Sequence, residues 1–341
     1  MKKTHGTGIR FLILALLFAL VFFGSFWVGR YDVSPLQTLR ILADWLLRTL
    51  SRGNLALMQT WQVRAQAVVM HVRLPLVGAA LSTAGCAYQG MFRNPMVSPD
   101  LLGASTGAGF GAALALLLGL GYGAVTGLSF TFGLLAVLLA YLISRMSKIQ
   151  TTLAMVLAGV MISSLFTSGT SFIKLVADPT DQLPAITYWL MGSLASTKAR
   201  DVQFAAWPIL AGPVPLWQLR WRVNLLTVSE TEARSMGVHT GRLRVVVVLC
   251  ATLMTAGSVA VSGMIGWVGL VIPHFGRMIF GQDYRKLLPA SSLLGAVFLM
   301  VVDNLARTVT TSEIPLGILT SFVGAPVFLY LIVSGGTQRE H

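Results

Sequence analysis

Long apolar runs separated by short polar connectors dominate this chain. A run of about 20 apolar residues is the length that an α-helix needs to cross the hydrocarbon core of a bilayer. Ten such runs occur, of which the third and the eighth are short and the eighth contains Pro273. Their approximate bounds are 11–28, 67–92, 102–118, 124–143, 151–176, 202–219, 245–261, 265–280, 287–306 and 314–333. The pattern therefore predicts an all-α polytopic membrane protein with about ten transmembrane helices.

The connectors between these runs hold no soluble domain. The first connector, which reaches to about residue 66, is polar and partly helical, and the loop at 177–184 precedes a partial helix over 188–194. No linker rich in proline or serine divides the chain. We therefore expect residues 1–341 to form a single membrane domain.

One connector, residues 224–244, is the densest polar segment of the chain. Ser229 can cap a helix and Glu232, three residues later, completes a capping box, while Glu230 lies where the helix dipole favours negative charge. Gly237 suits a left-handed cap at the other end. The predicted helix of about seven residues is roughly 10 Å long, which is too short to cross a bilayer. Such a helix between two spans suits docking to a partner in the aqueous phase, and a solvated connecting loop is the alternative.

The composition and the distribution of charge agree with a membrane protein. The chain is 55% hydrophobic and 11% charged, whereas a soluble domain carries about 25% charged residues. Its net charge of +13 does not indicate nucleic-acid binding, because the basic residues lie singly at the ends of apolar runs. A cytoplasmic N-terminus would place 15 of the 25 lysines and arginines on the cytoplasmic side of ten spans. By the positive-inside rule, both termini and the segment at 228–240 are expected to be cytoplasmic.

Enzyme signatures are missing from the sequence. It contains no GxxxxGK[ST], HExxH or GxSxG motif, and no legible Ser/His/Asp or paired-carboxylate arrangement. Cys86 and Cys250 lie within apolar runs, without a second cysteine or a histidine at metal-ligand spacing, as small buried residues do. An enzyme is therefore disfavoured. An ion-coupled secondary transporter is the rival class, although the chain shows no clear repeat and no acidic residue in the middle of a span.

A few ionisable residues lie at the ends of spans, where they are energetically costly and often functional. Asp303 and Arg307 are four residues apart on one helix face, so they can form a proton or ion relay, or simply an ion pair at the membrane edge. His274 and Arg277 flank Pro273, which is expected to break its helix and leave a kinked, water-facing end.

Six stretches of sequence, found in order and covering nearly the whole chain, together resemble one family. They are residues 73–108, 188–194 (YWLMGSL), 224–238 (NLLTVSETEARSMGV), 262–277, 287–307 and 313–332. The family is that of the FecCD-type permeases, the membrane subunits of ABC importers for vitamin B12, haem, iron–siderophores and some oxyanions. The combination of residues 183–193 with 265–274 is somewhat closer to the branch that contains molybdate and tungstate permeases.

The resemblance implies a permease with the type II ABC importer fold in the cytoplasmic (inner) membrane of a bacterium or archaeon. Such permeases form homodimers that bind two ATPase subunits on the cytoplasmic face and a periplasmic or lipoprotein binding protein on the other. ATP and magnesium bind to the ATPase, so this chain is expected to hold no cofactor and to be no enzyme. The implied function is uptake of a metal chelate, namely an iron–siderophore, haem or cobalamin. Uptake of molybdate or tungstate is the alternative within the family.

The resemblance also suggests candidate sites. The ATPase-coupling residues, within coupling helices at about 228–240, are Ser229, Glu230, Glu232, Ala233, Arg234, Met236 and Gly237. The cytoplasmic gate falls on Arg145, Ser147, Lys148, Gln150 and Thr151. The fifth span offers a weakly binding lining for the transport pathway, with ordinary helix packing as the alternative, through Met155, Met161, Ser163, Ser164, Thr167 and Ser168.

Docking of the binding protein is expected at Arg73 and Arg307, the basic positions at which such permeases meet acidic residues of their partner. The family usually has a further arginine where this chain has Leu76, so one docking charge is missing. Arg64 or Arg52 would then have to substitute for it.

Overall fold

The protein is a bundle of helices lying side by side. The structure is a computed structural model that describes residues 3–25, 58–148, 151–193, 206–228, 230–309 and 313–336, and helices are the only regular elements in these ranges. The long helices are α1 (Lys3–Gly24), α3 (Met58–Phe92), α4 (Ala104–Leu117), α5 (Tyr122–Met146), α6 (Thr151–Val176), α12 (Thr240–Ser262), α13 (Val268–Phe280), α14 (Tyr284–Thr308) and α15 (Leu316–Gly336). The short elements are η1 (Pro99–Leu102), α7 (Gln182–Leu190), α9 (Pro213–Gln218), α10 (Arg220–Leu226) and α11 (Glu230–Ser235).

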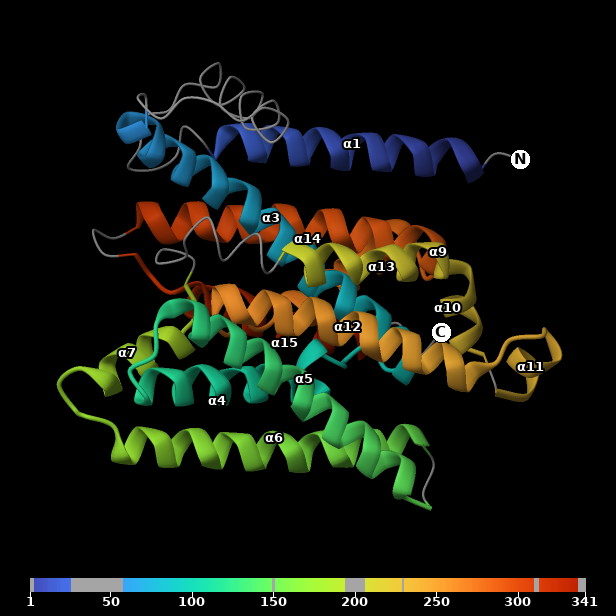
Figure 1. Cartoon of the computed structure of the whole chain (residues 1–341). Coiled ribbons are helices and arrows are strands. Elements are labelled where there is room, and N and C mark those ends of the chain that lie inside the picture. Colours follow the sequence, from blue (N-terminus) through green and yellow to red (C-terminus); the bar gives the residue numbers. More distant parts are fainter. Residues whose placement is uncertain are drawn as a thin grey trace.

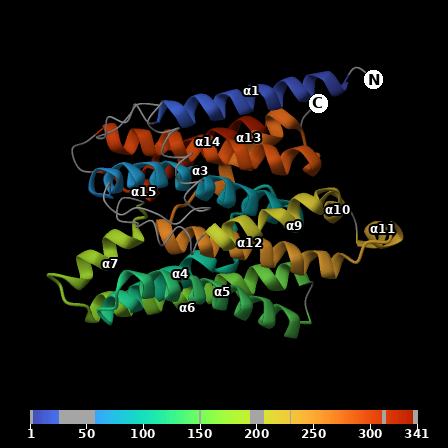
Figure 2. The same ribbon diagram turned by 45° about the horizontal axis from the view of Figure 1, so that its top comes forward.

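The two ends of the bundle differ in what they carry. The first turn of α1 and the last turn of α15 lie toward the end that carries α11, whereas α7 lies at the opposite end (Figures 1 and 2). We call these the α11 end and the α7 end. An even number of spans requires both termini to lie at one end, as the sequence predicted.

The predicted spans coincide with helices. Within the described ranges, five helices are long and apolar enough to cross a membrane, namely α1 from Gly6, α5, α6 from Thr152, α12 and α14. Three shorter apolar helices are α4, α13 and the Leu316–Tyr330 part of α15. Helix α3 and the helical residues between 206 and 218 match the two remaining runs. The all-α membrane fold is therefore confirmed.

Several boundaries differ from those predicted. Helix α3 begins at Met58 rather than near residue 67, because the polar residues before the apolar run are good helix formers and extend the helix beyond it. The sixth run is not one helix: residues 206–211 are helical, and the chain turns at Gly212 before the proline-led helix α9. The partial helix expected at 188–194 is α7, which begins earlier, at Gln182, and residue 194 lies outside the described residues.

Pro273 does not break its helix, contrary to the prediction. Helix α13 is continuous, with Pro273 as its sixth residue. Because proline lacks an N–H, the carbonyl of Gly269 loses its donor within the helix. That carbonyl lies against α3, where a Cβ on Gly85 would be only 1.8 Å from its oxygen. The carbonyl that the proline frees is thus the one that the backbone of α3 approaches.

Helix α3 is the centre of the bundle. It packs against α12, α13 and α14, and its residues Leu74 and Tyr88 are almost fully buried. Gly78 of α3 faces Gly295 of α14, and a Cβ on either glycine would lie within 2.3 Å of the other's carbonyl oxygen. Such close approach allows van der Waals packing between helices in lipid, where no hydrophobic force drives them together. Helices α3 and α14 therefore form one tightly packed pair.

Candidate functional site

Helix α11 projects from one end of the bundle (Figures 1 and 2). It has six residues, and the amides of Met236 and Val238 donate at 3.1 Å to the carbonyls of Glu232 and Ala233, with Gly237 at a φ of +76°. This is a Schellman-type end, and the left-handed glycine is the one that the sequence predicted. Ser229 and the side chains of Glu230 and Arg234 lie outside the described residues. The predicted short helix and its glycine end are therefore present, and the amino-terminal cap at Ser229 stays a prediction.

The two faces of α11 differ in exposure. Ala233 is buried and Val238, just after the helix, is 8% exposed, so these residues seat the helix on the bundle. Glu232 and Met236 are exposed. A hollow of about 240 Å³ beside the helix is lined in part by Met236, His239 and Arg242. The surface formed by α11 and the residues just after it thus combines acidic, basic and apolar groups within reach of a partner.

Arg93, the residue after α3, connects that helix to the segment that precedes α11. Its Nε donates to the carbonyl of Leu226 at 2.8 Å, and its Nη2 donates to the carbonyl of Val228. Arg93 has a φ of +52°, a left-handed conformation that favours glycine. The end of α3 is therefore held in an unusual backbone conformation while its side chain reaches the end of α10.

Asn224 connects α10 to the start of α14. Its Nδ2 donates to Oδ1 of Asp283 at 2.8 Å, and its Oδ1 accepts from the amide of Tyr284 at 2.8 Å. Asp283 also accepts from the amide of Arg285 at 3.0 Å and so caps α14. Burial raises the pKa of Asp283, but the bonds from Asn224 and Arg285 and the charges of Arg285 and Lys286 outweigh it, so that the pKa lies below its usual value.

Gln89 links three elements at the same end. Its Oε1 accepts from Nη2 of Arg277 at 2.5 Å, while its Nε2 donates to the carbonyls of Val97 and Leu270 at 3.1 and 3.2 Å. Arg277 therefore turns inward from α13 toward α3, and both Arg277 and His274 are half-buried. The water-facing helix end predicted at these residues is not found.

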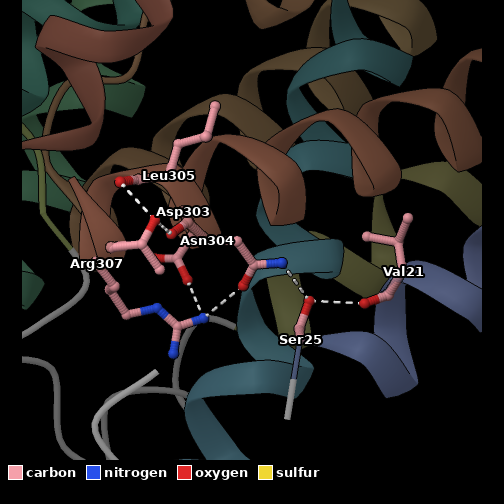
Figure 3. Close-up of polar contacts among 7 residues, drawn as sticks. Val21, Ser25, Asp303, Asn304, Leu305 and Arg307 are labelled. Carbon is pink, nitrogen blue, oxygen red and sulfur yellow. Dashed lines mark hydrogen bonds and ion pairs between the residues drawn. The ribbon is translucent and has the colours of Figure 1, made fainter. Parts of the chain in front are cut away.

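At the α7 end, a polar network joins α14 to α1 (Figure 3). Nη2 of Arg307 lies 2.6 Å from Oδ2 of Asp303, and the two side chains are 10% and 4% exposed. The same Nη2 donates to Oδ1 of Asn304 at 3.0 Å, and Nδ2 of Asn304 donates to Oγ of Ser25 at 2.8 Å. The ion pair expected from the sequence is present, and its guanidinium is engaged within the protein.

Docking of a binding protein at Arg73 and Arg307 stays a prediction. The network just described occupies the Nη2 of Arg307, which leaves little of its charge at the surface. The side chains of Arg73 and Arg64, and the whole of Arg52, lie outside the described residues. Leu76, at the position where a further arginine was expected, is partly buried against the main core.

The candidate gate lies between α5 and α6, toward the α11 end (Figure 1). Arg145 and Lys148 are exposed, and Ser147 is half-buried. Gln150 and the side chain of Thr151 lie outside the described residues. The described part of this connector is polar and accessible, as a gate would have to be.

The residues suggested as pathway lining do not share one environment. Met161, Ser164, Thr167 and Ser168 are exposed on α6, whereas Ser163 is half-buried. Met155 is only 2% exposed and belongs to the main core, so it does not lie on the exposed face. The hydroxyl of Thr167 donates to the carbonyl of Ser163 at 2.7 Å, and that of Ser171 donates to Thr167 at 3.0 Å. Because these hydroxyls are engaged by their own helix, the exposed face of α6 offers only weak binding to a passing solute.

Sequence reasoning missed Arg93, Asn224 and Gln89. Arg93 and Gln89 lie within 73–108 and Asn224 opens 224–238, yet no role was inferred for them. A signal did exist for Arg93, because the apolar run ends at Phe92 and Asn94-Pro95 follows, which places Arg93 at the usual position of a glycine cap. The carbonyl groups that its side chain reaches lie more than 130 residues later, and no sequence pattern reveals them.

The chain is similar to known proteins in both sequence and fold. A sequence model of the FecCD transport family matches residues 16–334. The molybdate import system permease protein MolB of Haemophilus influenzae is 38% identical over 337 residues, which cover 96% of each chain. A probable iron chelatin transport system permease of Helicobacter pylori is 40% identical over 271 residues, covering 78% of this chain and 82% of that protein. A solved structure described as a metal-chelate type ABC transporter in an inward-facing conformation is 33% identical, with a TM-score of 0.82 over 96% of this chain and 99% of the other.

Proposed function

The chain belongs to the FecCD transport family and is the membrane-spanning permease of an ABC importer, and on this premise we propose that it imports a metal chelate handed over by a binding protein. The substrate class comprises iron–siderophores, haem and cobalamin. Import is driven by two ATPase subunits, which bind ATP and magnesium on their own chains, and the permease works as a homodimer. Family membership excludes the ion-coupled secondary transporter as the main function.

The observation that carries the coupling part of this proposal is the position of α11. A helix of six residues cannot cross a membrane, and this one projects from the end of the bundle with Glu232 and Met236 exposed. The exposed connector with Arg145 and Lys148 lies toward the same end. Together with the excess of basic residues on this side, these features support a cytoplasmic α11 end that docks on the ATPase and carries both termini.

The transport route is proposed along the exposed face of α6. Residues 157–172 contain no charged side chain, and their exposed positions include both hydroxyl and apolar side chains. A second copy of the chain facing α6 would enclose this face. A wall without charge lets a bulky chelate pass without holding it tightly. The alternative, in which this face only packs against lipid or a neighbouring helix, predicts no access for a soluble thiol reagent at Ser164 or Ser168 once cysteine replaces them.

Molybdate or tungstate is the second candidate substrate, and one observation favours it. At nearly full coverage of this chain, the molybdate permease is 38% identical, whereas a vitamin B12 import permease of Salmonella typhi is 34% identical. Uptake assays in vesicles that contain the permease, the ATPase and the binding protein decide between them. Radiolabelled cobalamin, a ferric siderophore, haem and molybdate should be compared at equal concentration. Uptake of molybdate alone would overturn the metal-chelate proposal and leave the importer assignment intact.

The coupling role of α11 has its own test. Replacing Glu230, Glu232 and Arg234 together by alanine should leave the permease in the membrane and uncouple ATP hydrolysis from uptake. The physical reason is that the charged groups on the helix would no longer engage the ATPase cleft when the ATPase subunits close. Wild-type uptake by the triple variant, with its ATPase still attached, would show that α11 is not the coupling helix.

A further inference from the structure

We propose that Arg93 and Asn224 are positioning residues that transmit the displacement of α11 to the α3–α14 pair during transport. The inference rests on the proposed coupling role of α11, and it assigns the route by which motion at that helix reaches the spans. The route runs through α10 and consists of hydrogen bonds made by the side chains of Arg93 and Asn224, in addition to the covalent chain that continues from α11 into α12.

The first step is the connection between Arg93 and the segment before α11. The last carbonyl groups of any helix have no donor within the helix, and the carbonyl of Leu226 is the last of α10. Nε of Arg93 donates to that carbonyl at 2.8 Å, and its Nη2 donates to the carbonyl of Val228, which is two residues before Glu230. A single guanidinium from α3 therefore holds both the end of α10 and the short connector to α11.

The backbone of Arg93 has a left-handed conformation at the end of α3. Its amide bonds to the carbonyl of Gly90 at 3.3 Å, and the amide of Asn94 bonds to that of Gln89 at 3.2 Å, so Arg93 occupies the left-handed position at which helices usually carry glycine. A side chain in that conformation is energetically unfavourable, and such strain persists where the surroundings hold it. Glycine would fit the backbone better, so the property that arginine adds here is the reach of its guanidinium.

The third step is the attachment of α10 to α14. Asn224 donates to the carboxylate of Asp283 and accepts from the amide of Tyr284, both at 2.8 Å, so it engages the cap and the first residue of α14 together. Arg93 and Asn224 thus fix α10 at two points, one on the end of α3 and one on the start of α14.

The helices to which α10 is attached, α3 and α14, form a rigid pair. Helices α3 and α14 approach at Gly78 and Gly295, and α3 approaches α13 at Gly85 and Gly269, with backbone separations that leave no space for a methyl group. A tightly packed pair moves as a unit rather than bending locally. A displacement of α11 therefore acts on α3 and α14 together, and through α3 on α13.

The decisive experiment uses the assembled transporter with its ATPase, and two variants with different attachments. Arg93→Gly keeps the favoured backbone of the α3 end and removes the guanidinium. Asn224→Ala removes the attachment to α14. Arg220→Ala, on an exposed arginine at the start of the same helix, is the matched control. Spin labels on cysteines at Met161 of α6 and Leu305 of α14, both exposed, report the distance between these two helices without requiring a substrate.

With ATP and vanadate, the wild type and Arg220→Ala should show a change in the distance between the labels. Arg93→Gly and Asn224→Ala should hydrolyse ATP within about twofold of the wild-type rate and lose most of that change. A residue needed only for folding would lower abundance and hydrolysis together. A full distance change in either variant would overturn the proposal. If the wild-type permease does not bind an ATPase at all, the proposed function fails instead, so the two failures are distinguishable.

Discussion

The ion pair between Asp303 and Arg307 yields a prediction that distinguishes a stabilising role of Arg307 from a role in docking the binding protein. Asp303 is almost fully buried, and Arg307 contributes the cation at 2.6 Å (Figure 3). Arg307→Gln leaves a buried carboxylate without its cation, and breaking such a pair lowers the free energy of unfolding by about 3–5 kcal/mol. Asp303→Asn should cost less, about 1–3 kcal/mol, because Asn304 still accepts from Arg307 at 3.0 Å.

The double variant measures how far Asp303 and Arg307 stabilise one another. With both charges removed, glutamine and asparagine can hydrogen-bond as neutral groups, so the double variant should be more stable than Arg307→Gln alone. The coupling between the two positions should then reach about 2 kcal/mol or more. The measurement is the unfolding midpoint of the four purified proteins in mixed detergent–SDS micelles, converted to free energy with a common slope. The affinity of each protein for the binding protein is measured in parallel.

Additive effects would refute this reasoning, because they would mean that the two side chains do not stabilise one another. The docking hypothesis makes the opposite prediction. If Arg307 serves mainly to bind an acidic partner, Arg307→Gln should weaken binding in a salt-dependent manner and leave the unfolding midpoint almost unchanged, since exposed pairs contribute only about 0–1 kcal/mol. Asp303→Asn would then strengthen docking by releasing the guanidinium.

Three further predictions follow from other regions. Gly85→Ala should destabilise the protein by about 1–3 kcal/mol, because a methyl group 1.8 Å from a carbonyl oxygen forces α3 away from α13. The control is Gly127→Ala, where no atom lies within 4 Å of the added methyl group. It should be neutral or stabilising by up to about 1 kcal/mol in the same unfolding assay. The pKa of Asp283 is lowered in the folded state, so its stabilising effect is present above the unfolded value of about 3.9 and lost as the pH falls through the folded pKa. The protection factor for hydrogen exchange at the start of α14, which is the ratio of the intrinsic to the observed exchange rate, should therefore be insensitive to this group from pH 8 to about 5 and fall in stronger acid. Asp283→Asn should remove that fall in the protection factor, and a transition near neutral pH would contradict the assignment. Cysteines on the connector at 145–152 should crosslink between two copies in one nucleotide state and not in the other, and equal crosslinking in both states would exclude a gate there.

The spans were predictable because lipid imposes a single requirement on the sequence. A helix that crosses a bilayer needs a long apolar run, and nine of the ten predicted runs each coincide with a single helix in the described residues, the sixth being divided at Gly212. The ends of the helices obey other rules. Hydropathy cannot locate the start of α3 at Met58, because a helix continues into water as long as its residues favour helix. Pro273 was misjudged for a related reason, since a proline in the second turn of a helix removes one hydrogen bond without ending the helix.

The candidate site was predictable only where it depends on local sequence. The glycine end of α11 follows from the order of residues in one short segment, and Gly237 adopts the expected conformation. The burial of Met155 does not follow from its type, because methionine and serine suit both a packed face and an open one. The attachment made by Arg93 depends on two parts of the chain far apart in sequence, and only the tertiary structure brings them together.

The contacts of Arg93 also impose an order on the biogenesis of the protein. The carbonyl groups that hold its side chain belong to residues 133 and 135 positions later in the chain. At a synthesis rate of about 5–20 residues per second, those groups emerge roughly 7–27 seconds after Arg93 itself. During that interval α3 has been synthesised but the side chain of Arg93 lacks its two carbonyl acceptors. We therefore expect the turn at 93–97 to adopt its final conformation only after α10 has been made. Ribosome-bound chains that stop before and after residue 228 should differ in protease cleavage at this turn, and identical cleavage would show that the turn forms without its distant acceptors.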